Sequence, residues 1–174
     1  MLTRKIIFLD FDGVLNTESY FQTLMQQGVP THDELGVLFD SNSVAKLAEI
    51  INLTNAQIVV SSSWRYMGVS ELQRMWKLRK LPGKIVGFTP LNLLDEELLT
   101  IDLDNLDSFT PECLVARGSE IQAWLDNHTG IANYLILDDL TDILPSQKKH
   151  FVQINPIKGI TKENVVQALQ ILQS

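Results

Sequence analysis

The chain has 174 residues, of which 45% are hydrophobic, and its net charge at pH 7 is −7. This size predicts one globular domain over residues 1–174, and no apolar run is long enough to span a membrane. The acidic balance argues against an extended basic surface for nucleic acid, although a local basic pocket with a metal can still accept a nucleic-acid end. The single cysteine, Cys113, excludes an internal disulfide, and no signal peptide is evident, so we expect a cytoplasmic location.

The first predicted element is a strand at 6–9, where apolar residues follow one another without alternation. Such a run is typical of a strand buried on both faces of a parallel sheet. Asp10 and Asp12 follow the strand directly, and Gly13 allows the backbone to turn sharply. A calcium loop can also contain Asp-x-Asp-Gly, but the preceding strand and the absence of a loop glutamate nine residues on argue against one.

A short helix or hairpin is expected near 17–27, followed by loop up to residue 40. Asp40 or Ser41 is predicted to cap a helix that runs to about residue 53, and the next strand is expected at 57–60. A helix capped by Ser70 is predicted over 70–80, and a short strand over 85–88.

Residues 91–112 contain many acidic side chains and no lysine or arginine, which favours a solvated, partly helical insertion that could overhang a site as a lid. The predicted elements that follow are a helix at 117–128, strands at 133–137 and 151–154, and a helix at 161–172. Because strands alternate with helices, the pattern predicts an α/β fold with three layers around a parallel sheet.

Polar side chains follow three of the predicted strands. Asp10 and Asp12 follow the first strand, Ser61 follows the second, and Asp138 and Asp139 follow the fourth. Ligands in open α/β sheets bind beyond the carboxyl ends of the strands, so we expect these side chains to share one site. For Asp138 and Asp139, a turn and a helix cap are the alternative to metal binding.

This arrangement resembles the first, second and fourth motifs of the haloacid dehalogenase (HAD) superfamily, and Arg117 stands where the third motif places a lysine or arginine. The finer pattern resembles the compact HAD domain of "Swiss Army Knife" RNA-repair proteins over Ile6 to about Leu140. The segments that carry this likeness are Phe-Leu-Asp-Phe-Asp-Gly-Val-Leu-Asn, Ser-Ser-Ser-Trp-Arg, Arg-Gly-Ser-Glu-Ile and Leu-Asp-Asp. The resemblance implies a Rossmann-like parallel sheet with a minimal cap domain or none.

The resemblance also implies Mg²⁺-dependent phosphoryl transfer. Asp10 is expected to attack phosphorus and form an aspartyl-phosphate, while Asp12 protonates the leaving oxygen and then takes a proton from water. Mg²⁺ prefers oxygen ligands, and we expect it to bind Asp10, the backbone carbonyl of Asp12 and one of Asp138 and Asp139.

The substrate phosphate is expected to lie on Ser61 and Ser62, with Arg117 neutralising its charge. The family more often has lysine at the third motif, which leaves other cations open as rivals: Arg65, Lys84 and Lys158. Arg65 is therefore included among the candidate phosphate-binding residues.

Several aromatic and histidine side chains have a structural and a functional interpretation. Trp64, beside the predicted site, could stack on a base or sugar, although packing in the core or loop is favoured. His32, His128 and His150 lack metal-ligand spacing and are expected to be solvated or core residues.

The sequence as a whole predicts a Mg²⁺-dependent phosphomonoester phosphatase. Residues 17–40 leave room for little more than a flap, and an open site favours bulky phosphoesters such as nucleic-acid ends. The alternatives are a small-nucleotide phosphatase and a non-catalytic binding module with the same fold. A receiver-like signalling domain is disfavoured, because no later lone phosphoacceptor aspartate with a partner lysine is found.

Overall fold

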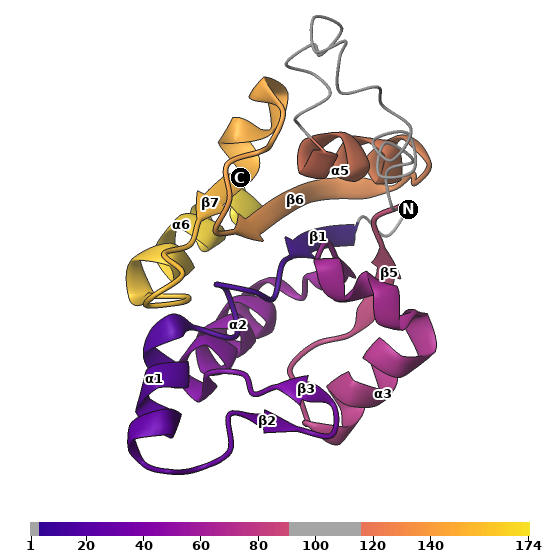
Figure 1. Ribbon diagram of the computed structural model, residues 1–174. Coiled ribbons are helices and arrows are strands. Elements are labelled where there is room, and N and C mark those ends of the chain that lie inside the picture. The colour runs from indigo at the N-terminus through magenta and orange to yellow at the C-terminus, as the bar shows by residue number, and fades with distance from the viewer. Residues whose placement is uncertain (1–3, 91–115) are drawn as a thin grey trace, which may run out of the picture.

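The computed structural model describes residues 4–90 and 116–174 of the chain. Its central feature is a five-stranded parallel sheet with the strand order β5-β4-β1-β6-β7 (Figure 1). The strands are β1 (Arg4–Leu9), β4 (Gln57–Val60), β5 (Ile85–Phe88), β6 (Ile131–Asp138) and β7 (Phe151–Gln153). The predicted α/β, Rossmann-like parallel sheet is therefore confirmed.

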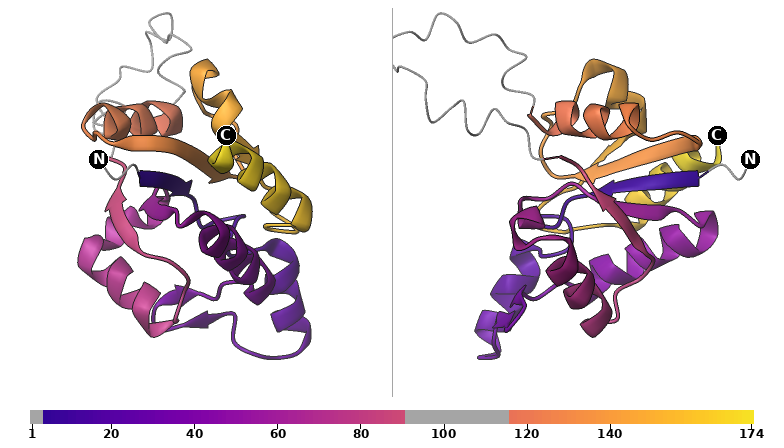
Figure 2. Two further views of the ribbon diagram at one scale, coloured as in Figure 1. Left: turned by 180° about the vertical axis from the view of Figure 1, so that it is seen from behind. Right: turned by 90° about the vertical axis from the view of Figure 1, so that its right-hand side faces the viewer.

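Helices cover both faces of the sheet, as the two views of Figure 2 show. One face packs against α2 (Ser41–Thr54), α3 (Val69–Leu78) and α6 (Lys162–Gln173), and the other packs against α5 (Ala116–Asp126). Within β1, Ile7 and Leu9 belong to the first core, while Ile6 and Phe8 belong to the second. Burial on both faces explains why β1 contains consecutive apolar residues rather than an alternating pattern.

The segment between β1 and α2 forms a helix and a small hairpin. The helix is α1 (Glu18–Gln26), and the hairpin pairs β2 (His32–Asp33) with β3 (Gly36–Val37) in antiparallel fashion. The helix agrees with one of the two predicted alternatives, but the hairpin lies where loop was expected. Two-residue strands carry too little alternation to be recognised in a sequence, and this hairpin depends on distant contacts with Arg79. No large cap is present in the described ranges, as predicted.

The described residues also form two short 3₁₀ helices, η1 (Ser63–Met67) and η4 (Pro145–His150). The prediction that Ser70 caps α3 was wrong: the N-cap is Gly68, and no side chain caps this helix. Because η1 ends directly at Gly68, α3 begins at Val69. Asp40 caps α2 and Thr161 caps α6 as expected.

The acidic segment predicted as an insertion or lid, residues 91–112, lies outside the described residues. In the part of the chain that the structure does describe, no helix is long and apolar enough to cross a membrane.

Candidate active site

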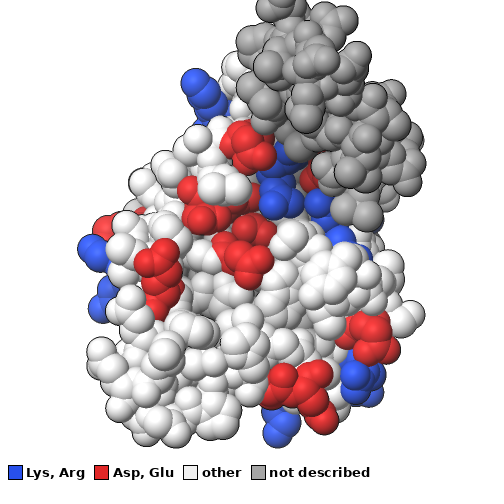
Figure 3. All heavy atoms as spheres, in the orientation of Figure 1, with Lys and Arg blue, Asp and Glu red and all other residues white. Residues whose placement is uncertain are grey.

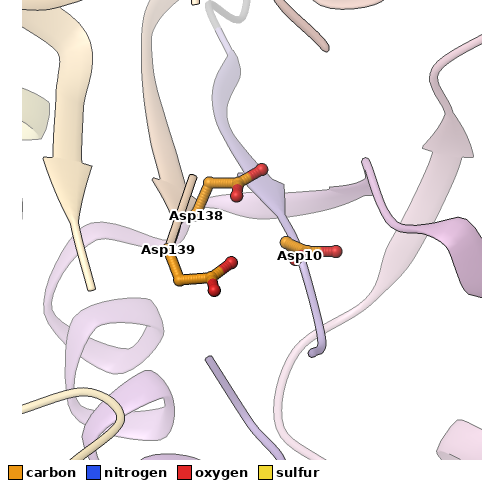
Figure 4. Close-up of side chains that lie close together, drawn as sticks. All are labelled: Asp10, Asp138 and Asp139. Carbon is orange, nitrogen blue, oxygen red and sulfur yellow. The ribbon is translucent and has the colours of Figure 1, made fainter. Parts of the chain in front are cut away.

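The acids at the ends of β1 and β6 come together at the carboxyl edge of the sheet. The two strands are neighbours in the sheet, with Leu9 opposite Leu137, and the Asp10 amide donates to the Leu137 carbonyl (3.0 Å). Ligand atoms of Asp10, Asp138 and Asp139 all lie within 4.8 Å of one another. Figure 4 shows the carboxyl groups of Asp138 and Asp139 extending from the end of β6 toward Asp10. The structure therefore brings both members of the Asp138-Asp139 pair to Asp10.

A tight turn directly follows Asp10 at the end of β1, and the carboxylate of Asp139 lies close to it. The side chain of Phe11 is buried in the core, and its carbonyl accepts hydrogen bonds from the amides of Val14, Leu15 and Asn16. Gly13 has a φ of +72°, and a Cβ placed there would lie 2.7 Å from Asp139 Oδ2. A glycine is thus required by both the backbone conformation and the close approach of the Asp139 carboxylate.

Asp12 occupies a different position from Asp10. Its side chain is exposed, and it does not belong to the three-carboxylate cluster found among the described residues. Its carboxylate accepts hydrogen bonds from Asn16 Nδ2 (2.7 Å), Trp64 Nε1 (3.1 Å) and Ser63 Oγ (3.2 Å). The side chain of Asp12 is therefore available to solvent at the rim while neighbouring donors restrict its orientation.

Arg117 is the cation nearest to the cluster of acids. It lies in the first turn of α5, and its guanidinium approaches Asp138 Oδ2 (3.1 Å), Asp10 Oδ1 (3.8 Å) and Glu120 Oε2 (3.8 Å). A positive charge at a helix N-terminus is unfavourable on its own, so these acids compensate for the helix dipole. Arg117 therefore lies at ion-pairing distance from two of the three clustered aspartates, and its predicted role in neutralising phosphate stays a prediction.

Arg65 has a different set of partners. Its guanidinium donates to the carbonyls of Ser62 (2.7 Å), Thr89 (3.1 Å) and Pro90 (3.0 Å), and also to the Thr89 hydroxyl. It also forms an ion pair of 3.0 Å with Glu120, in which both side chains are only 7% exposed. These contacts join the segment after β4 to the end of β5 and to α5.

The two lysines considered as rival cations lie apart from the acids. Lys84 immediately precedes β5, at the opposite edge of the sheet, and lines a cavity of about 480 Å³ with Lys77 and Lys80. Lys158 is exposed in a turn between β7 and α6. Among the described residues, neither lysine forms an ion pair with the candidate site.

Burial in this region changes the protonation of the acids. Burial raises the pKa of Asp10 to about 6, and Arg117 and a hydrogen bond with Ser62 oppose this effect. Burial, assisted by the negative charge of Asp10, raises the pKa of Asp138 to about 8. Burial also raises the pKa of Asp139. The protein surroundings therefore disfavour the ionised form of these three carboxyl groups.

Among the described residues, three buried polar atoms on the candidate side chains have no hydrogen-bond partner: Ser61 Oγ, Arg117 Nε and Asp138 Oδ2. The last two form an ion pair of 3.1 Å without hydrogen-bond alignment. Buried polar atoms are usually satisfied, so orphaned ones point to an absent ligand. A hard cation with a phosphate suits this set, because the carboxylates are oxygen ligands while the hydroxyl and guanidinium are donors. These residues therefore fit both Mg²⁺ and a phosphoester.

The remaining candidate residue, Ser62, is fully buried beside Ser61. Its hydroxyl accepts a hydrogen bond from the Trp64 amide (3.4 Å) and interacts with the Asp10 carboxyl. Ser62 thus contacts the protein rather than open solvent, whereas the unpartnered hydroxyl belongs to Ser61.

Sequence analysis missed the contributions of Glu120 and of the Trp64 indole N–H. Glu120 follows Arg117 by one helical turn, a spacing that could have indicated an ion pair. The indole is 7% exposed and packs in the core, so the favoured packing interpretation of Trp64 is confirmed. The bond from its N–H to Asp12 has no signal in the sequence, because it joins segments that are distant along the chain.

The histidines also agree with the structural interpretation. His128 stacks on Trp124 with ring centroids 3.8 Å apart, and His150 stacks on Tyr134 at 3.9 Å. His32 interacts with the Thr31 hydroxyl at 2.8 Å and is exposed. The candidate metal group among the described residues contains only aspartates.

The surface charges are local rather than extended. On the face seen in Figure 3, Asp and Glu side chains gather near the middle of the molecule beside a smaller group of Lys and Arg side chains. Most of the remaining described surface on this face is uncharged. This face therefore offers a local mixed-charge site and no broad basic surface.

A parallel sheet with this strand order and clustered acids at the ends of β1 and β6 defines a HAD-like fold. Residues 6–165 match the family described as the HAD domain in Swiss Army Knife RNA repair proteins, and the chain belongs to this family. No curated protein matched the chain. Membership indicates a phosphohydrolase-type function on a phosphoester, in a superfamily whose members typically use Mg²⁺.

Proposed function

We propose that the protein is a Mg²⁺-dependent phosphomonoester phosphatase that acts through an aspartyl-phosphate, with residues 1–174 as a single domain. The observation that carries the proposal is the cluster of Asp10, Asp138 and Asp139 beside Arg117. It combines oxygen ligands for a hard cation with a planar cation suited to phosphate. When bound there, Mg²⁺ supplies the positive charge that offsets the repulsion between a phosphate ester and a carboxylate nucleophile.

The two aspartates of the first motif divide the chemistry between them. A carboxylate oxygen of Asp10 attacks phosphorus, the bond from phosphorus to the leaving oxygen breaks, and Asp12 gives that oxygen a proton. Water then attacks the phosphorus of the aspartyl-phosphate and gives a proton to Asp12, which releases inorganic phosphate and restores both side chains. The exposure of Asp12 supports this role, because the group must reach both a leaving group and water.

Ser61 and Arg117 are the proposed phosphate ligands, because the buried Ser61 hydroxyl has no hydrogen-bond partner among the described residues and the Arg117 guanidinium lies beside the clustered acids. Ser62 supports Asp10 through its hydrogen bond and lies next to the phosphate position. For Arg65 we propose a positioning role in place of direct phosphate binding, because its guanidinium already contacts Ser62, Thr89, Pro90 and Glu120.

The proposed substrates are bulky phosphomonoesters, with phosphorylated nucleic-acid ends as the leading class. In the described ranges, only α1 and a two-residue-strand hairpin are inserted between β1 and α2, and this insertion is smaller than a large cap domain. The RNA-repair description of the family favours an RNA end in particular. We propose a cytoplasmic location on the basis of the sequence.

The test is phosphate release from nucleotides, sugar phosphates and end-phosphorylated DNA and RNA, each with Mg²⁺ and with a chelator. We expect Mg²⁺-dependent release that Asp10→Asn abolishes, while Asp126→Asn, which changes an exposed carboxyl at the end of α5, has little effect. Preference for free nucleotides would favour the small-nucleotide alternative. The absence of turnover, together with no effect of Mg²⁺ on melting, would reject the enzyme in favour of a binding module.

A further inference from the structure

The indole of Trp64 joins the hydrophobic core to the exposed carboxylate of Asp12. The ring is 7% exposed and packs against Phe11 and Phe39, with centroid distances of 5.7 Å and 5.6 Å. Its N–H is directed out of this aromatic cluster and lies 3.1 Å from Asp12 Oδ1 and 3.2 Å from Oδ2. A buried ring therefore offers its one polar atom to the proposed acid–base group.

The other two donors to Asp12 are not packed in the core. Ser63 Oγ (3.2 Å) belongs to an exposed side chain whose hydroxyl can rotate. Asn16 Nδ2 (2.7 Å) belongs to a partly exposed side chain, whose Oδ1 accepts a hydrogen bond from the Gly13 amide (3.0 Å). An exposed aspartate explores several rotamers unless donors select one. Among these donors, the indole N–H has its direction set by core packing.

The β2–β3 hairpin closes the opposite side of the indole. A Cβ at Gly36 would lie 3.0 Å from Cη2 of Trp64, so the hairpin backbone rests directly on the six-membered ring. Arg79 fixes this hairpin through an ion pair with Asp33 (2.6 Å) and through bonds to the carbonyls of Gly36 (3.1 Å) and Val37 (2.9 Å). The ring consequently has little freedom to move away from Asp12.

We propose that Trp64 is a positioning residue that holds the Asp12 carboxyl group in line with the leaving oxygen of the substrate, and that the β2–β3 hairpin holds Trp64 in place. This inference rests on the proposed phosphatase function. It assigns Trp64 an effect on proton transfer that core packing alone does not require.

Proton donation matters most for poor leaving groups, so the role of Trp64 can be tested by comparing substrates with a good and a poor leaving group. A nitrophenolate leaves readily without a proton, whereas an alkoxide needs one in the transition state. Loss of the indole N–H should therefore slow hydrolysis of an alkyl phosphate much more than hydrolysis of p-nitrophenyl phosphate. A change that merely weakened the fold would slow both esters alike.

The experiment compares kcat/KM, which reports the steps up to formation of the aspartyl-phosphate, for p-nitrophenyl phosphate and glycerol 2-phosphate in the full chain with Mg²⁺. We expect Trp64→Phe to lower kcat/KM for the alkyl ester about tenfold more than for the aryl ester, which is part of the roughly 100- to 10,000-fold that general acid–base catalysis contributes. Trp76→Phe is the matched control, because Trp76 is also buried and its indole N–H donates to the Pro82 carbonyl (3.0 Å) away from Asp12. It should leave the ratio of the two rates unchanged.

A second variant separates the N–H from the ring. Benzothienylalanine at position 64 keeps the ring shape but replaces the N–H with sulfur. It should therefore reproduce the change in the ratio of the alkyl to the aryl rate, even if Trp64→Phe has a low melting temperature. Equal loss on both esters, or no loss, in a folded variant would overturn the role of Trp64 while leaving the phosphatase intact. If the wild-type chain hydrolyses neither ester nor any other phosphomonoester, the proposed function fails and this inference fails with it.

Discussion

At the scale of single residues, the protein contains two kinds of buried serine side chain. Ser43 is fully buried, and its hydroxyl accepts a hydrogen bond from the Ile160 amide (3.1 Å), so it contributes to the fold. Ser61 is about as buried, yet its hydroxyl has no hydrogen-bond partner in the described part of the chain. An unsatisfied buried hydroxyl is a cost to the free protein, and a phosphate oxygen would remove that cost. We therefore assign Ser43 to the stability of the fold and Ser61 to ligand binding.

We expect Ser61→Ala to stabilise the free protein and weaken phosphate binding. Removing the unsatisfied hydroxyl should raise the free energy of unfolding by up to about 1–3 kcal/mol, the cost of leaving such a group unpaired. Thermal melting without ligand checks the stability, and the KM for a phosphomonoester checks the binding. Ser43→Ala, which loses a satisfied bond, should instead destabilise by about 1 kcal/mol. A destabilised Ser61→Ala would contradict the idea that this hydroxyl is reserved for a ligand.

Arg117 should be needed for turnover because it stands beside the proposed nucleophile. We expect Arg117→Met to lower kcat/KM by about 100- to 1,000-fold, the usual loss when a preorganised group that stabilises developing charge is removed. Arg117→Lys keeps the charge without the planar fork, so it should recover only part of the loss. The control is Arg74→Met, since Arg74 forms an exposed ion pair with Glu71. Full activity of Arg117→Met would contradict this role and would favour another cation as the phosphate ligand.

At the scale of elements, charged side chains hold the active-site segments together. Arg65 donates to the carbonyls of Ser62, Thr89 and Pro90, which follow different strands, and pairs with Glu120 on α5. These contacts fix the end of β4 relative to the end of β5 and to the helix that carries Arg117. Removing Arg65 would take the closest cation from the buried Glu120 and the donor from three backbone carbonyls, and losing one partner of a buried pair costs more than the attraction itself.

Arg65→Met should therefore act mainly on stability. We expect a loss of about 3–5 kcal/mol in the free energy of unfolding, the range for removing one partner of a buried pair. Denaturant unfolding measures this loss. Activity per folded molecule should fall less than for Arg117→Met, since Arg65 is assigned to positioning. A folded Arg65→Met with normal stability and a greatly raised KM would show that Arg65 binds phosphate after all.

At the scale of the whole molecule, sheet topology determines where the acids meet. β1 lies in the centre between β4 and β6, so residues 10, 61 and 138 follow three adjacent parallel strands. The two packed cores hold these ends in register, and the acids accumulate charge that the fold alone does not compensate. The site therefore lowers the stability of the metal-free fold at neutral pH.

The stability of the Mg²⁺-free protein should fall as pH rises, whereas the stabilisation by Mg²⁺ should grow as pH rises. The pKa of Asp10 rises from 3.8 to about 6 and that of Asp138 rises to about 8, so the folded state binds more protons than the unfolded chain in this window. Their contribution to stability is complete below about pH 4 and is lost as pH rises through about 6 and 8. Because Mg²⁺ binds the deprotonated carboxylates, its effect on stability should grow over the same range.

The measurement is the shift in melting temperature caused by Mg²⁺ between about pH 5 and pH 8. We expect the shift to increase with pH in the wild-type protein and to be strongly reduced in Asp138→Asn, which removes one proposed ligand. Asp126→Asn serves as the control because its carboxyl is exposed and outside the cluster. A Mg²⁺ effect that is independent of pH would mean that the ion binds elsewhere.

The sequence by itself determined the class of fold, the first motif and the acids that belong to the site. Ile6–Leu9 and Gly13 carry local signals, because a doubly buried strand and a positive-φ turn each restrict which residues can occupy them. The alternation of strands and helices restricted the topology, and the parallel sheet placed Asp10 and Asp138 at a common edge. Each of these inferences depends on short-range patterns or on general rules of chain connection.

Only the tertiary structure decided how the polar side chains divide their roles. Arg65 and Arg117 are alike as residue types, but one contacts several backbone carbonyls and the other faces the acids. The bond between Trp64 and Asp12, and the hairpin that rests on Trp64, join segments that are far apart in the chain. The direction of a side chain is set by packing against distant neighbours, and no periodicity along the sequence records those neighbours.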